Sequence, residues 1–332
     1  MDESPGRHPM NENNEVKFTS NMNRIIPETQ VTSTNKLSQD YLETPELASA
    51  MREGTKIVHS AAENSVFTKR FLNGEINVDE YGRYVTSLYF VYRTLENLLA
   101  QHKHNPVVQK VHFPYELNRE NALLKDIEYY YGKNRVAEMT DFKNITPAVQ
   151  NYITSLQDAA AKDPSLLIAH SYARYLGDLS GGQILAKRLK KHVLKISASD
   201  PAWDSYEGLE FYNFDHIGNH TEFKTLYRQC LNEARVTQEM KDTIVDEAIR
   251  AFKLNIALFD EIQYLSENNK LHTTAKDRGK KSSVSSTVTE SSTLEGSTKR
   301  RAFNADWLVG FATGGITVAL CISIYNRIYN SQ

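Results

Sequence analysis

The chain has 332 residues, more than one average domain needs, and 40% of them are hydrophobic while 24% are charged. This balance is typical of a largely globular chain and argues against a disordered or fibrous protein. The formal net charge of −2 gives no whole-chain electrostatic case for a nucleic-acid partner. The two cysteines, Cys230 and Cys321, lie far apart. Their spacing matches no zinc or redox motif and argues against a disulfide-stapled secreted fold.

Residues 1–40 are polar and rich in asparagine, and they contain no apolar stretch. The hydrophobic region of a signal peptide is therefore missing, and we expect a flexible arm. Residues 41–268 differ, because apolar side chains recur there at helical spacing. We expect this part to be one folded domain.

Three stretches of that domain have apolar residues every three or four positions, the period of an amphipathic helix. The first begins at Thr44-Pro45-Glu46, where Thr44 is the expected N-cap and Pro45 the first helical residue. The others are residues 81–101 and 237–266. No stretch alternates with period two for long enough to predict a sheet, so the expected fold class is all-α.

A further helix is predicted over residues 164–195, and its middle contains Gly177, Gly181 and Gly182. Each glycine inside a helix costs about 0.5–1 kcal/mol relative to alanine, so three of them within six residues need a reason. Gly177 and Gly181 are four residues apart and share a face of bare backbone that a flat group can approach. A seam against a neighbouring helix is the alternative. Asp178 counts against a seam, because a carboxylate there must be solvated, paired or used.

The first predicted helix carries Arg52, Lys56 and His59 at positions i, i+4 and i+7, so the three side chains share one stripe. Glu63 follows His59 by one turn and is placed to orient the imidazole. Two cations leading to a histidine form a basic entrance to a ligating side chain. A solvated surface histidine among solvated cations is the alternative.

Lys224 and Arg228 repeat the i, i+4 cation spacing in a helix expected from Thr221. Metal-bundle and zinc-protease motifs (Glu-x-x-His, His-Glu-x-x-His) are absent, as are phosphate-binding glycine loops and a Gly-x-Ser-x-Gly elbow. The patterns that remain are one candidate metal-binding histidine, a helix face of bare glycine backbone, and cations placed to bind carboxylates. Haem, with one axial position and two anionic groups, matches that combination.

Residues 307–326 are twenty consecutive residues without a charge. As a helix they span about 30 Å, the thickness of the hydrocarbon core of a bilayer. We expect a transmembrane anchor in the lipid bilayer, with a buried core helix as the alternative. A serine- and threonine-rich tether at 269–306 precedes it, and a short tail at 327–332 follows.

Basic residues just before the anchor predict that the folded domain stays in the cytosol. This arrangement is typical of a tail-anchored protein of the endoplasmic reticulum membrane, although outer mitochondrial membrane proteins use similar signals. Gly310 and Gly314 form a Gly-x-x-x-Gly pair within the span. A homodimer through this pair is an open expectation.

The stretch AHSYARYLGDLSGGQ at residues 169–183 resembles the signature of the haem oxygenases. The similarity continues in order through residues 56–59, 87–89, 112–114, 223–228 and 255–256, and it covers roughly residues 44–266. The resemblance implies a single multi-helix catalytic domain. In that domain, haem lies between a proximal helix and a glycine-rich distal helix.

The resemblance also implies roles for the matching residues. His59 is expected to ligate the iron. The residues expected to hold the propionates are Arg52, Lys56, Tyr172, Lys224 and Arg228, and those expected to form the distal wall are Gly177, Gly181 and Gly182. Asp178 is expected to anchor an ordered water network, with Tyr92, Arg174 and Asn255 as further members.

The reaction implied by the resemblance uses haem as both substrate and prosthetic group. O2 and electrons from NADPH–cytochrome P450 reductase cleave the ring at its α-meso carbon to biliverdin, carbon monoxide and ferrous iron, and biliverdin reductase is a further candidate partner. Two alternatives stay open. One is a haem-binding sensor or carrier without turnover, and the other is a tail-anchored helical adaptor that binds a partner helix. Asp178 favours catalysis over binding alone.

Overall fold

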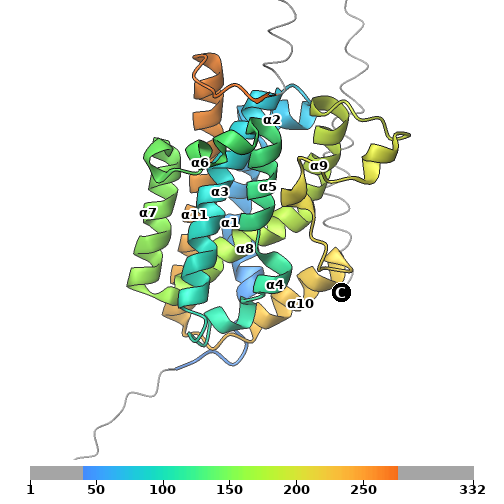
Figure 1. Cartoon of the computed structure of the whole chain (residues 1–332). Helices are drawn as coiled ribbons and strands as arrows, with labels where there is room; N and C mark the ends of the chain where they lie inside the picture. The colour runs from blue at the N-terminus through green and yellow to red at the C-terminus, as the bar shows by residue number, and fades with distance from the viewer. Residues whose placement is uncertain (1–39, 276–332) are drawn as a thin grey trace, which may run out of the picture. The chain divides into compact units, whose positions relative to one another are not determined.

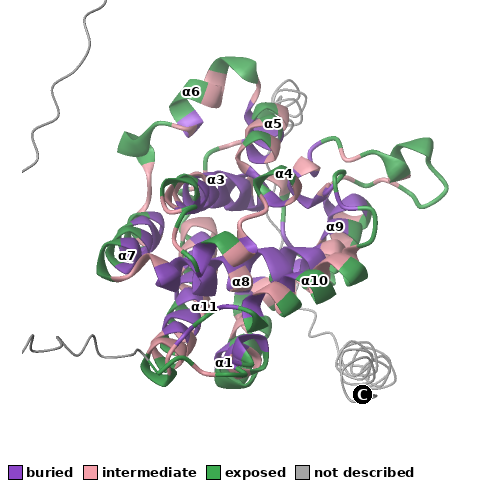
Figure 2. Cartoon of the chain, turned by 90° about the horizontal axis from the view of Figure 1, so that it is seen from below, coloured by how far each residue is buried: buried purple, intermediate pink, exposed green. Residues whose placement is uncertain are grey.

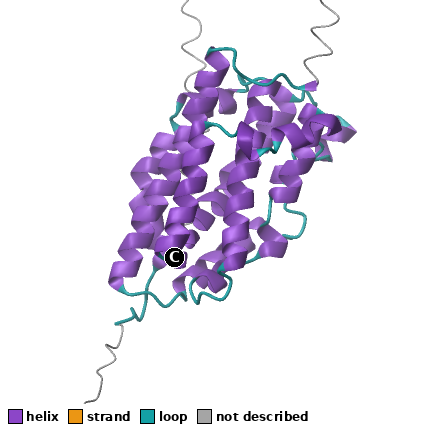
Figure 3. Cartoon of the chain, turned by 60° about the vertical axis from the view of Figure 1, so that its left-hand side comes forward, coloured by secondary structure: helices purple, strands orange, loops and turns teal. Residues whose placement is uncertain are grey.

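The computed structural model describes residues 40–275 (Figure 1). Across this range the regular secondary structure is entirely helical, so the predicted all-α class is confirmed (Figure 3). None of the described helices is both long and apolar enough to cross a membrane. The predicted arm up to residue 39, the tether from residue 276, the anchor and the tail lie outside the described residues.

The described helices differ widely in length, and short 3-10 turns join several of them. The α-helices are α1 (Leu47–Glu63), α2 (Val66–Asn73), α3 (Val78–Gln101), α4 (Pro114–Leu117), α5 (Glu120–Tyr131), α6 (Val136–Met139), α7 (Pro147–Lys162), α8 (Leu167–Gly177), α9 (Gln183–Arg188), α10 (His220–Asn232) and α11 (Gln238–Glu267). The 3-10 turns are η1 (Val108–Val111), η2 (Lys133–Arg135), η3 (Phe142–Asn144), η4 (Pro164–Leu166), η7 (Pro201–Asp204) and η8 (Glu210–Tyr212), and η5 (Asp178–Gly182) and η6 (Leu189–Val193) are π-helical.

Helix α11 is the central support of the bundle, because α1, α2, α3, α7 and α8 all pack along it. Its apolar side chains Ile244, Ala248, Ala251, Leu258 and Ile262 recur at helical spacing and are buried. Buried residues line the faces that the helices turn toward one another (Figure 2). Full burial of a leucine or isoleucine is worth about 1.5–3 kcal/mol, so this shared core fixes the helices relative to one another.

Two of the predicted helices are present nearly as expected. Residues 81–101 lie within α3, and residues 237–266 correspond to α11. Local sequence explains both starts, because Asn77 and Glu80 form a capping box before α3. Thr237 accepts a hydrogen bond from the Met240 amide at the start of α11.

The predicted start of the first helix is wrong. Helix α1 begins at Leu47, and its N-cap is Glu46, which has a φ of 46° and makes no side-chain cap. The cap comes instead from Asn232 at the end of α10, whose Oδ1 accepts from the Ala48 amide at 3.0 Å. A bond across 184 positions leaves no signal in the local sequence pattern.

The helix predicted over residues 164–195 is present, but it is not a regular α-helix. It starts with the 3-10 turn η4, continues as α8, widens into the π-helical η5, returns to α9 and widens again in η6. The first π segment carries the glycine cluster. Such π segments are rare, and they occur frequently at functional sites.

Candidate active site on the glycine-rich helix

Asp178 is the first residue of η5, and its carboxylate is buried, with 6% of the residue exposed. The hydroxyl of Tyr92 on α3 donates a hydrogen bond to Oδ2. The guanidinium of Arg174, one turn earlier on α8, lies 3.5 Å from Oδ1. The buried carboxylate therefore has an opposite charge and a hydroxyl donor beside it, which offset the cost of its burial.

Arg174 connects this carboxylate to α11. Its Nε donates to the Tyr92 hydroxyl oxygen at 3.0 Å, and its Nη1 donates to Oδ1 of Asn255 at 2.5 Å. The Asn255 amide donates in turn to the carbonyl of Ala251 at 3.0 Å. The four residues predicted as members of an ordered water network, on α3, α8, η5 and α11, form one buried hydrogen-bonded cluster, the Asp178 cluster.

Burial and neighbouring groups shift the pKa values of the residues in the Asp178 cluster. Burial raises the pKa of Asp178, and the opposing charge of Arg174 and the hydroxyl of Tyr92 work against that rise. Burial also raises the pKa of the Tyr92 hydroxyl well above its ordinary value. Tyr92 therefore stays a hydrogen-bond donor at neutral pH, and Asp178 holds a proton more readily than an exposed aspartate does.

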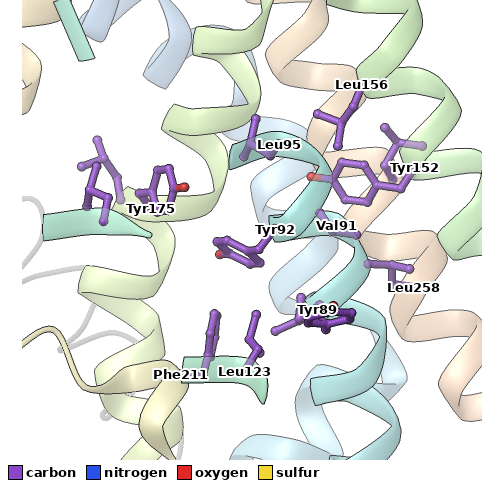
Figure 4. Packing of buried hydrophobic residues seen from close by; sticks show 14 of the residues in the cluster. Tyr89, Val91, Tyr92, Leu95, Leu123, Tyr152, Leu156, Tyr175, Phe211 and Leu258 are labelled. Carbon is purple, nitrogen blue, oxygen red and sulfur yellow. The ribbon is translucent and has the colours of Figure 1, made fainter. Parts of the chain in front are cut away.

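Aromatic packing fixes the Tyr92 ring in place. The rings of Tyr175 and Phe211 meet it edge to face, with centroids 5.7 Å and 5.4 Å away (Figure 4). Leu95, one turn along α3 from Tyr92, is fully buried in the same core. The hydroxyl that contacts Asp178 therefore stands on a rigid support.

The glycines beside Asp178 fall into two groups. Gly177 and Gly181 are exposed, and a Cβ added at either position meets nothing within 4 Å. Gly182 is buried, and an added Cβ meets the Tyr212 ring at 3.2 Å. Gly177 and Gly181 present the open backbone face that the sequence predicts, whereas Gly182 faces a neighbouring aromatic ring.

His59 lies on the outer side of α1, with 53% of its side chain exposed. Its Nδ1 is 3.6 Å from Glu63, as the one-turn spacing predicts, and its ring lies 5.4 Å from that of Phe252 on α11. Within residues 40–275, the Nε2 atom makes no hydrogen bond or ion pair. The free nitrogen is therefore available to an incoming ligand, while Glu63 and Phe252 orient the ring.

The predicted cations lie on two helices. On α1, Arg52 pairs with Glu53 at 3.0 Å and Lys56 is exposed. On α10, Lys224 donates to the hydroxyl of Ser180 at 3.0 Å, and Arg228 donates to the carbonyl of Lys224 at 3.1 Å.

Tyr172 is half-buried on α8, where it packs against the core. None of these α1 and α10 side chains belongs to the four-residue Asp178 cluster. The α1 cations and the α10 cations stand on separate helices. Helices α1 and α8 both pack against α11.

Two residues that make contacts at the site were not predicted from the sequence. Gln183 donates from its side-chain amide to the carbonyls of Asp178 (3.3 Å) and Tyr212 (3.1 Å), and so satisfies backbone at the π segment. Ser180 is the partner of Lys224. Both residues stand inside the signature stretch, but Tyr212 and Lys224 are distant from them in sequence, so no local pattern identifies these two contacts.

Comparison with known proteins places the chain in a family. The family model described as heme oxygenase matches residues 45–261. The chain belongs to the haem oxygenase family. Heme oxygenase 1 of Gallus gallus is 41% identical over 220 residues, which cover 66% of this chain and 71% of that protein. Heme oxygenase 1 of Synechocystis is 42% identical, with coverage of 65% and 85%.

Solved structures agree with the haem oxygenase assignment. The crystal structure of Synechocystis heme oxygenase-1 in complex with heme superposes with a TM-score of 0.60 at 39% identity, and it covers 73% of this chain and all of that one. The structure from Leptospira interrogans gives a TM-score of 0.58 at 36% identity, with coverage of 65% and 99%.

The residues of this haem oxygenase fit haem as a bound group. Bare backbone at Gly177 and Gly181 leaves room for a flat macrocycle. The exposed imidazole of His59 has a free Nε2, the donor atom that haem iron accepts. Lys56 and Lys224 supply ammonium groups for two carboxylates, and no carboxylate of the described chain lies within 4.0 Å of either.

Proposed function

We propose that this haem oxygenase cleaves haem at the α-meso carbon to biliverdin, carbon monoxide and ferrous iron, using O2 and reductase-supplied electrons. Bound haem supplies the redox-active iron and the ring that is oxidised. The observation that carries the proposal is the Asp178 cluster, a buried carboxylate with fixed partners beside an open face of glycine backbone. A protein that only stores haem has no need of a buried proton-holding group beside its distal face.

His59 is the proposed iron ligand. Its exposed imidazole faces away from the core, and the carboxylate of Glu63 lies 3.6 Å from Nδ1, which leaves Nε2 open to the iron. The side chain thus binds the iron without any rearrangement of the core residues of α1.

Cations on both sides of the site are proposed to bind the two propionates. Arg52 and Lys56 approach from α1, and Lys224 and Arg228 approach from α10. Tyr172 adds a hydroxyl from α8. Charge-assisted bonds to two carboxylates fix the rotation of the ring in its plane, and so decide which meso carbon faces the wall.

Asp178 is proposed to hold and move protons, through ordered water, during oxygen activation. Arg174 and Tyr92 keep its carboxylate pointing in one direction, and Asn255 restrains Arg174 in turn. Burial raises the pKa of Asp178 toward neutral pH. A proton donor works best when its pKa lies near the working pH. Gly177 and Gly181 let the ring lie close enough for this proton transfer.

Sequence outside the described residues supports the membrane part of the proposal. The uncharged run at 307–326, with basic residues just before it, supports a tail anchor in the endoplasmic reticulum membrane. The catalytic domain, residues 41–268, then faces the cytosol. NADPH–cytochrome P450 reductase is the proposed electron donor, biliverdin reductase is a candidate downstream partner, and Gly310 with Gly314 is a candidate dimer contact.

Turnover of bound haem tests the proposed function. The full-length chain is titrated with hemin and then supplied with O2, NADPH and cytochrome P450 reductase. The expected result is loss of the Soret band, with biliverdin and carbon monoxide formed in equal amounts. A stable one-to-one complex that keeps its Soret band under these conditions would instead identify a sensor or carrier.

A further inference from the structure

Ser180 is the middle residue of η5, and its hydroxyl accepts a hydrogen bond from the Nζ of Lys224 at 3.0 Å. Lys224 belongs to α10, which otherwise packs mainly on α1 and η1. The bond joins the glycine-rich π segment to a helix that carries cations. Asp178 and Ser180 are the two polar side chains of η5, and Asp178 turns inward to Tyr92.

The ammonium group of Lys224 has donors to spare. Its hydrogen bond goes to one neutral hydroxyl, and no carboxylate oxygen of residues 40–275 lies within 4.0 Å of it. Burial and the neighbouring charge of Arg228 lower the pKa of Lys224. A cation in these surroundings favours an added carboxylate, and two of its three N–H groups remain for one.

The side chain of a lysine is flexible, and its ordering on ligand binding costs entropy. The bond to Ser180 orders the side chain of Lys224 before any ligand arrives. Because the hydroxyl belongs to η5, it also fixes the ammonium at a set position relative to the open glycine backbone. Gly181, directly after Ser180, is part of that backbone.

We propose that Ser180 is a positioning residue for substrate: it holds Lys224 ready for a haem propionate and sets the distance from that propionate to the glycine wall. The inference rests on the proposed role of Lys224 as a propionate partner. Ser180 thereby couples two events: binding of a haem propionate by Lys224, and placement of the haem ring against the backbone of Gly177 and Gly181.

Hemin binding by Ser180→Ala and Ser180→Thr tests this proposal. Loss of the pre-ordering of one flexible side chain weakens binding by roughly two- to tenfold. We expect that loss for Ser180→Ala with hemin, and near wild-type affinity for Ser180→Thr, which keeps the hydroxyl. Hemin dimethyl ester has no carboxylates, so its affinity should be the same in all three proteins.

Equal weakening for hemin and its dimethyl ester would overturn the proposal, because it indicates a packing effect. Unchanged or tighter hemin binding by Ser180→Ala would also overturn it. Lys224→Gln separates this inference from the proposed function. If Lys224→Gln binds hemin like the wild type, the propionate role of Lys224 fails; if it weakens binding while Ser180→Ala does not, only the role of Ser180 fails. In the Lys224→Gln background, Ser180→Ala should have no further effect.

Discussion

At the scale of single residues, the phenol of Tyr92 decides how Asp178 behaves. It donates to the carboxylate and accepts from Arg174, so it stands between the two buried charges. The bond stabilises the ionised form of Asp178 and works against the effect of burial. Any change in this hydroxyl therefore changes the proton affinity of the carboxylate.

Tyr92→Phe is expected to raise the pKa of Asp178, because a donor to the ionised carboxylate is lost while burial remains. The midpoint of the pH profile of biliverdin formation that reports Asp178 should therefore move to higher pH. Measurement at saturating haem tests this. Tyr175→Phe is the control, since its hydroxyl faces Glu96 at 3.5 Å. Equal profiles for Tyr92→Phe and wild type would contradict the assignment.

His59→Ala is expected to abolish the histidine-ligated haem spectrum and to reduce turnover by at least about 100-fold, since loss of a ligand costs at least as much as loss of its outer partner. The fold should persist, because the imidazole is half-exposed and lies outside the buried face of α1. Absorption spectra of the hemin complex, with circular dichroism as the folding control, give the result. Added imidazole should restore part of the spectrum. An unchanged spectrum would exclude His59 as the ligand.

At the scale of elements, the π segment η5 separates two kinds of glycine. Gly181 faces open space and Gly182 faces Tyr212, although they are adjacent in the chain. Their positions depend on a local widening of the helix. An ideal α-helical projection of the sequence places Gly177 and Gly181 correctly on one face, but it does not indicate the widening.

Gly181→Ala should leave the haem-free protein as stable as the wild type, or up to about 1 kcal/mol more stable, because alanine favours a helix and its methyl group meets no atom within 4 Å. The same methyl group should weaken hemin binding at least tenfold. Gly182→Ala should show the opposite result: the protein should lose stability because the methyl group contacts Tyr212, and its hemin affinity should change less. Thermal unfolding and hemin titration of both variants provide the comparison. Wild-type hemin affinity in Gly181→Ala would show that haem does not lie on this face.

The sequence predicts helices best where local pattern and local caps agree, as they do at Asn77 before α3 and Thr237 before α11. It fails where a distant group supplies the cap, as Asn232 does for α1. Spacing alone identified Asp178 and the bare glycine face. The membership of Tyr92 and Asn255 in one network with Asp178 came from family resemblance, because helices far apart in sequence meet only in the folded core.

At the scale of the whole molecule, two buried carboxylates tie loops and helices together. Glu96 of α3 accepts from the amides of Arg119 (2.5 Å) and Glu120 (3.3 Å), and burial raises its pKa from 4.5 to about 7. Asp126 of α5 accepts from two amides of η8, both at 2.8 Å, and burial raises its pKa from 3.8 to about 7. Between about pH 4.5 and 7 these two carboxyl groups therefore hold more protons in the folded state than in the unfolded chain.

Because the folded state binds the extra protons, its stability should fall as pH rises from about 4.5 to 7. Glu96→Gln removes one titrating group, so the free energy of unfolding should depend less on pH across this window. Urea unfolding at pH 5 and pH 7.5 measures the difference. Glu128→Gln, at an exposed position of α5, is the control and should keep the wild-type dependence. The same dependence in Glu96→Gln as in the wild type would contradict the assignment to Glu96.

The most direct test of the proposed role of Asp178 compares Asp178→Asn with the wild type in one assay of hemin affinity and biliverdin formation. Asparagine keeps the size of the side chain and removes its ability to hold an acidic proton. We expect hemin affinity within about threefold of the wild type, and biliverdin formation slower by about 100-fold or more, the usual contribution of a proton-transferring side chain. Biliverdin formation at the wild-type rate would contradict the central role given to Asp178.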